Sequence, residues 1–158
     1  MERPKVYLES SVISYLAARP SRDILATAHQ QVTREWWERS RSRCDLFVSG
    51  EVLNEIRRGD PAASQLRLTY VRDLPVLEAD DQARVLAAEI LRTSALPQKA
   101  AADAAHIAIA TVNGMDFLLT WNCTHIANGL VQRAISRLSR EMGFEPPTIV
   151  TPEELTEL

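Results

Sequence analysis

Residues 5–11 read KVYLESS, a short apolar run that ends abruptly in an acid and two serines. The Val and Tyr content favours a β-strand over 5–8, because such side chains fit a pleated, half-buried surface. Ser10 or Ser11 is expected to cap a following helix, since a serine hydroxyl can accept from the free N–H groups of a first helical turn. This stretch therefore predicts a strand that passes directly into a helix.

The same succession of strand and helix recurs to the end of the sequence. Helical patterns begin near residues 10, 24, 49, 61, 80, 98 and 125, and the strands expected between them cover 5–8, 45–48, 74–77, 116–120 and 148–150. Alternating strands and helices predict the α/β class, with a central parallel sheet of about four to five strands flanked by helices on both faces. We expect one domain over residues 1–158.

Several helix boundaries carry a specific signal. Asp60 and Pro61 are expected at the N-cap and first position of a helix, and Gly114 and Gly143 are expected just after the ends of helices at 98–113 and 125–142. Ser49 should open another helix. The last segment, 151–154, is predicted to start a capped helix, with Thr151 as the cap and Glu154 reaching back to it.

The composition excludes several classes of protein. The 158 residues include 5 glycines and 2 cysteines, and the net charge is −3. This leaves no glycine-rich phosphate loop, no disulfide framework and no uniformly cationic nucleic-acid binder. We also expect no signal peptide and no membrane span, so a reduced cytoplasmic protein is the default.

Acids and polar residues gather where the predicted strands end. Glu9 follows the first strand, Glu55 lies on the helix after the second, and Asn122 follows the strand at 116–120. Ligands of such sheets bind outside the carboxyl ends of the strands. Asp103 opens a helix that could lean over this edge. Carboxylate and amide oxygens suit a hard cation such as Mg²⁺ or Mn²⁺.

Each of these residues also has a simpler interpretation. On the pattern alone, Glu55 is an exposed acid paired with Arg57 or Arg58. Asp103 fits the polar stripe of an alanine-rich helix as well as it fits a ligand. His106, three residues further on, is interpreted as a surface or interface residue of the helix rather than as a ligand.

Four segments in this order resemble the PIN-domain family, and in particular the VapC-type toxins of toxin–antitoxin pairs. The segments are VYLESSVIS at 6–14, FVSGEVLNEI at 47–56, DAAHIA at 103–108 and GMDFLLTWN at 114–122. The resemblance covers nearly the whole chain and implies a three-layer PIN-like fold. The stretch from Trp121 to Asn128 differs from the commonest family sequence, which points to a divergent branch.

The resemblance implies a set of site residues. Glu9, Glu55 and Asp103 would bind Mg²⁺ or Mn²⁺, with Asn122 completing or orienting the site, and these four are the candidate catalytic residues. Glu9 and Asn122 stand where the family usually has aspartate. Glutamate adds a methylene, so either its carboxylate must fold back or the metal must shift. Asparagine removes a negative charge, which weakens cation binding.

The implied activity is a metal-dependent endoribonuclease that cleaves RNA phosphodiesters. Supporting roles fall to Ser10 and Thr120, as hydrogen-bond donors to a ligand carboxylate or a phosphate. Four arginines could hold the RNA backbone, although surface ion pairs are at least as good an explanation for them: Arg19, Arg22, Arg57 and Arg58. The resemblance further implies a homodimer and a cognate antitoxin protein, with no membrane partner.

Two other functions fit parts of this pattern. The substitutions at Glu9 and Asn122 would also suit a degenerate PIN domain that binds RNA or a protein partner without cleaving. A flavodoxin-like domain that binds a small molecule would share the alternation of strands and helices, but the sequence offers no phosphate loop for it.

Overall fold

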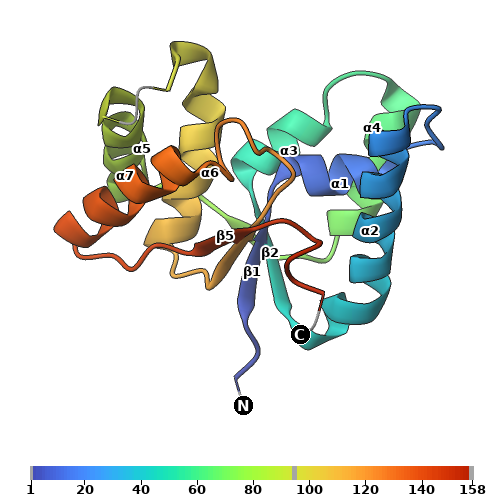
Figure 1. Ribbon diagram of the computed structural model, residues 1–158, viewed down its shortest axis with the longest axis horizontal. Coiled ribbons are helices and arrows are strands. Elements are labelled where there is room, and N and C mark those ends of the chain that lie inside the picture. The colour runs from blue at the N-terminus through green and yellow to red at the C-terminus, as the bar shows by residue number, and fades with distance from the viewer. Residues whose placement is uncertain (1, 94–95, 157–158) are drawn as a thin grey trace.

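The computed structural model describes residues 2–93 and 96–156, and a parallel β-sheet forms its centre (Figure 1). The strands are β1 (Lys5–Leu8), β2 (Asp45–Ser49), β3 (Val76–Leu77), β4 (Phe117–Leu119) and β5 (Thr148–Val150). They lie in the order β3-β2-β1-β4-β5, and every neighbouring pair is parallel. The stretch at 5–11 thus contains the central strand.

Helices cover both faces of this sheet. On one side lie α1 (Ser10–Ala17), α2 (Ile24–Ser40), α3 (Gly50–Ile56) and α4 (Pro61–Val71), and on the other lie α5 (Asp81–Thr93), α6 (Ala101–Val112) and α7 (Gly129–Glu141) (Figure 1). Short 3₁₀ turns occur at Arg41–Arg43 and Gln98–Ala100. The predicted three-layer α/β architecture is confirmed. Within the described ranges, no helix has both the length and the apolar character needed to cross a bilayer.

The core explains why β1 is apolar at consecutive positions. Val6, Tyr7 and Leu8 are all 0% exposed, because helices cover both faces of the strand. Val6 lies in register with Leu46 on one neighbour and Phe117 on the other. Because both faces of β1 are buried, the polar residue that follows its carboxyl end is the first that can reach a ligand outside the core.

Most of the predicted helix boundaries are confirmed. Ser49 caps α3, and Asp60 caps α4 with Pro61 at its start. Gly114 and Gly143 have φ angles of 69° and 85°, in the left-handed region that glycine enters without steric cost.

The cap of α1 differs from the prediction. Neither Ser10 nor Ser11 caps this helix; Glu9 does, and its carboxylate accepts from the Ser11 N–H at 3.0 Å. Glutamate can reach this N–H because its extra methylene lets the side chain fold back over the first turn. The Glu9 carboxylate thus folds back, and its partner there is the helix itself.

Three other predicted elements extend further than the structure shows. The strand expected at 74–77 is reduced to Val76–Leu77, and the helix expected from residue 125 begins at Gly129. Asn128 caps that helix by accepting from the N–H groups of Leu130 and Val131. The end segment forms a turn rather than a helix, although Glu154 does accept from the Thr151 N–H at 3.1 Å.

Candidate active site

Three neighbouring strands end in polar residues at the same edge of the sheet. Glu9 follows β1, Ser49 ends β2, and Thr120 follows β4. Helices α3 and α6 approach each other above this edge from opposite layers, and they bring Glu55 and His106 to it. Ligands were expected at this edge, and side chains from all three layers converge there.

Glu9 is held rigidly at the centre of this edge. It is 5% exposed, and its Oε1 accepts from the Ser11 hydroxyl at 2.5 Å and from the Thr120 hydroxyl at 2.6 Å. Its Oε2 accepts from the Ser11 backbone N–H. A carboxylate offers about four lone-pair sites, so these three bonds leave capacity for a further ligand. The Thr120 hydroxyl thus donates to Glu9, which is the contact that its predicted supporting role would require.

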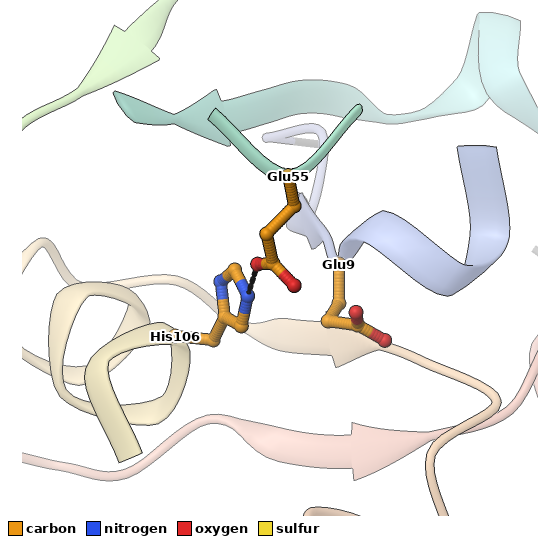
Figure 2. Close-up of side chains that lie close together, drawn as sticks. All are labelled: Glu9, Glu55 and His106. Carbon is orange, nitrogen blue, oxygen red and sulfur yellow. Dashed lines mark hydrogen bonds and ion pairs between the residues drawn. The ribbon is translucent and has the colours of Figure 1, made fainter. Parts of the chain in front are cut away.

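Glu55 forms an ion pair with a histidine rather than with the predicted arginines. Its Oε1 accepts from Nε2 of His106, a side chain that is 0% exposed (Figure 2). Of the two placements predicted for His106, the helix surface is wrong and a helix interface is right, because α6 turns this side chain inward to the Glu55 carboxylate. Arg58 contributes only as a nearby positive charge.

The ionisation of this pair follows from its surroundings. Burial alone would lower the pKa of His106, but the hydrogen bond to Glu55 and the charges of three nearby carboxylates outweigh burial and raise it. Partial burial alone would raise the pKa of Glu55, but His106 holds it below the usual range. Both shifts favour a charged pair, with imidazolium facing carboxylate.

A buried hydroxyl network supports His106 from behind. The Tyr7 hydroxyl lies 2.6 Å from Nδ1 of His106 and 2.6 Å from the Ser49 hydroxyl, which also accepts from the backbone N–H of Val52. Burial raises the pKa of Tyr7 far above its usual value, so the phenol stays protonated. The network fixes the position of the histidine ring, and the ring in turn fixes Glu55.

We expect Tyr7→Phe to destabilise the fold by about 1–3 kcal/mol, because it leaves the buried Ser49 and His106 groups short of a hydrogen-bond partner. Urea unfolding of the variant and wild type measures this cost. Tyr70→Phe, at a half-buried ring that packs edge-on against Trp37, is the control and should cost less than about 0.5 kcal/mol. A Tyr7→Phe effect as small as that of the control would contradict the network.

Glu9 and Glu55 supply two carboxylates to a candidate cation site, with His106 beside them. One ligand atom from each lies within 4.8 Å of the others, close to the about 4 Å that separates opposite ligands of Mg²⁺. The Ser10 hydroxyl beside them is buried, and its interaction with the Glu55 carboxylate helps to lower the pKa of Glu55. Two carboxylates fit a small oxygen-seeking cation such as Mg²⁺ or Mn²⁺, and His106, whose Nε2–H is donated to Glu55, orients one of them.

Asp103 lies in a second, adjoining cluster. Its Oδ1 accepts from Nδ2 of Asn122 at 3.1 Å, and its Oδ2 lies 2.9 Å from Nδ1 of His125. Asn122 also accepts from the backbone N–H of His125 through its own side-chain oxygen. Asp103 is near enough to His106 to raise its pKa, but its two oxygens are already engaged by side chains.

The predicted site residues therefore divide into three sets. Glu9, Glu55, Ser10 and Thr120 meet at the sheet edge, while Asp103 and Asn122 pair beside it. The four predicted RNA-binding residues are all exposed: Arg19, Arg22, Arg57 and Arg58.

Sequence reasoning missed His106 and His125 as members of the site. The available signal was the three-residue spacing of Asp103 and His106, which puts both on one face of α6. For His125, the only signal was its position three residues after Asn122. The contact of His125 with Asp103 joins residues 22 positions apart, so no local pattern contains it.

Comparison with known proteins relates the chain to solved structures. No protein-family model matches it, and no curated protein is similar to it in sequence. VapBC2 from Rickettsia felis, solved bound to a DNA fragment from its promoter, matches with a TM-score of 0.59 and 13% identity, over 93% of this chain and 98% of that one. VapC20 from Mycobacterium tuberculosis, a toxin that cleaves the sarcin–ricin loop, has a TM-score of 0.59 and 15% identity, over 88% of this chain and 95% of that one.

These matches span almost the full length of both chains. They confirm the predicted fold, which is that of the VapC-type PIN domains.

Proposed function

We propose that this chain is a metal-dependent endoribonuclease that cleaves RNA phosphodiesters, and that it is the toxin of a toxin–antitoxin pair. One observation carries the proposal: Glu9 and Glu55, from different elements, converge at the carboxyl edge of a sheet with the VapC fold. The two carboxylates repel each other; the His106 imidazolium offsets that charge on Glu55, and a bound cation would offset the charge that remains.

Glu9 and Glu55 would hold Mg²⁺ or Mn²⁺, with Asp103 and Asn122 supplying oxygens from the adjoining cluster. A bound divalent ion lowers the pKa of water and offsets negative charge on a phosphate, which is the chemistry that phosphodiester hydrolysis requires.

The residues of the chain itself prepare this edge. Ser11 and Thr120 orient the Glu9 carboxylate, and His106 orients that of Glu55. Asn122 and His125 do the same for Asp103. These supports matter because partners that orient metal ligands typically contribute about 10- to 100-fold to metal affinity or activity. The exposed Arg58, near Glu55, is the best placed of the predicted arginines to bind a phosphate.

The remaining partners are part of the same proposal. The substrate would be cytoplasmic RNA, and a cognate antitoxin would hold a homodimer of the toxin in check.

A second candidate function is supported by three specific contacts. Asp103 uses both carboxylate oxygens on Asn122 and His125, and Glu55 is already paired with the charged His106. A site satisfied by its own side chains suits a degenerate PIN domain that binds RNA or a protein without cleavage.

A cleavage assay separates the two. We expect the protein, freed of divalent ions with EDTA, to leave labelled RNA intact and to cleave it when Mn²⁺ or Mg²⁺ is added in excess. RNA that stays intact under every metal condition, but binds with a measurable Kd, would favour the degenerate domain. Cleavage at the same rate in EDTA would contradict the metal-dependent mechanism.

A further inference from the structure

Three aromatic rings from three separate elements form a cluster beside Glu9. The His29 ring of α2 stacks on the Trp121 indole with centroids 3.9 Å apart and an interplanar angle of 14°. Tyr15 of α1 packs edge-on against both, at 5.4 Å from His29 and 6.2 Å from Trp121. We call Tyr15, His29 and Trp121 the aromatic cluster.

Hydrogen bonds fix the aromatic cluster in place. The Trp121 Nε1–H donates to the hydroxyl of Thr33 at 2.8 Å, and Thr33 is fully buried on α2. Mobile rings that simply cover the core would not need such a bond. The orientation of the indole plane is therefore set by the fold.

The cluster is also linked directly to the acidic edge. The backbone N–H of Trp121 donates to the Ser11 hydroxyl at 2.9 Å, and that hydroxyl donates to the Glu9 carboxylate. Trp121 itself follows Thr120, the other hydroxyl donor to Glu9. The Ser11 hydroxyl therefore links the backbone of Trp121 to the Glu9 carboxylate, which would hold the cation.

Exposure and charge suit this cluster to a nucleic-acid ligand. All three rings are half-buried, so part of the aromatic surface faces solvent. The loop that joins the helices of Tyr15 and His29 carries the exposed Arg19 and Arg22. Aromatic rings and basic side chains on one protein surface are the combination that binds single-stranded nucleic acid, since bases can stack on the rings and phosphates attract the positive charges.

We propose that the aromatic cluster is a stacking subsite for an unpaired nucleobase of single-stranded RNA next to the scissile phosphate. This inference rests on the proposed ribonuclease function and adds a substrate requirement: the RNA must be unpaired at the base that stacks. A duplex, whose bases are already stacked and paired, would not fill the subsite.

Binding of two 12-nucleotide probes tests the subsite. One is a fluorescein-labelled uridine 12-mer, and the other has the same phosphates but an abasic spacer at every position. Fluorescence anisotropy is measured in EDTA, and a gel verifies that the RNA is intact. We expect the wild type to bind the uridine 12-mer more tightly, because only that probe can stack.

Paired variants isolate the stacking contribution. His29→Leu and Trp121→Leu keep apolar bulk, and we expect each to weaken binding of the uridine 12-mer about tenfold while leaving the abasic probe unaffected. His29→Phe retains a ring and should bind as the wild type does. Trp37→Leu, whose indole lies at the amino end of the strands beside Arg41 and Tyr70, is the control and should change neither Kd.

The outcomes separate the subsite from the nuclease. Equal affinity of the leucine variants and the wild type for the uridine 12-mer would overturn the subsite, even if the wild type cleaves RNA. Loss of base-dependent binding in the leucine variants would support the subsite, even if no cleavage is observed. Near-ultraviolet circular dichroism verifies that each variant is folded.

Discussion

The Glu55→Gln variant is expected to cleave RNA more than about 100-fold more slowly than the wild type. The substitution keeps the shape of the side chain and removes the negative charge that would hold the cation. Residues that only orient metal ligands contribute about 10- to 100-fold, and a direct ligand should contribute more. The rate is measured as initial cleavage of labelled RNA with saturating Mn²⁺.

A matched control lies one turn earlier on the same helix. Glu51 is also half-buried on α3, but it lies outside the cluster of Glu9, Glu55 and His106. Glu51→Gln should therefore cleave within about twofold of the wild type, a change that corresponds to less than about 0.5 kcal/mol. A Glu55→Gln variant that is folded and as active as Glu51→Gln would remove Glu55 from the mechanism.

The Asp103→Ala variant is the second expected loss, also of about 100-fold. The substitution removes the carboxylate that holds Asn122 and His125 and deletes one of the negative charges near His106. Removing only a partner should cost less, so His125→Ala is expected to slow cleavage by about tenfold. The same RNA assay measures both variants.

Asp81→Ala is the control for the loss of an acid from the first turn of a helix. Asp81 is fully exposed at the start of α5, in an ion pair with Arg84, and exposed pairs contribute little. Its activity should match that of the wild type. If Asp103→Ala cleaves at the wild-type rate in protein free of host nuclease, Asp103 has no part in the site. The expectation that Asp103→Ala loses more activity than His125→Ala would then also be wrong.

The sequence was sufficient to predict the sheet and the edge at which the candidate site lies. Apolar runs such as residues 5–8 are buried on both faces, so they stand out as strands, and the polar residue that ends each run marks the carboxyl end. Glu9 could be located in this way from the amino-acid pattern alone. Helix caps such as Asp60 with Pro61 could also be predicted from the sequence, because a cap depends on contacts within one helical turn.

The partners of the acids could not be predicted in the same way. Asp103 and His106 share a face of α6. Which of the two contacts Glu55 depends on how α6 packs against α3 at the edge of the sheet. Tyr7, Ser49 and His106 meet through contacts that span 42 and 99 residues. Local patterns contain no information about such pairings, which arise only when the layers pack.

The cap of α1 shows the same limit at short range. Serine is the stronger capping residue by general preference, yet Glu9 takes that position because its carboxylate also accepts from Thr120, which lies 111 residues away. The contact across the sheet decides which oxygen faces the helix, and a pattern confined to residues 9–11 does not include it.

Calorimetric titration of Mn²⁺ into EDTA-treated, dialysed protein tests the central claim most directly. The wild type and Glu51→Gln are expected to give saturable heats from a site containing Glu9 and Glu55, and Glu55→Gln is expected to give none in the same concentration range. Absence of saturable binding by the wild type, or an unchanged isotherm for folded Glu55→Gln, would contradict a cation site between these two carboxylates.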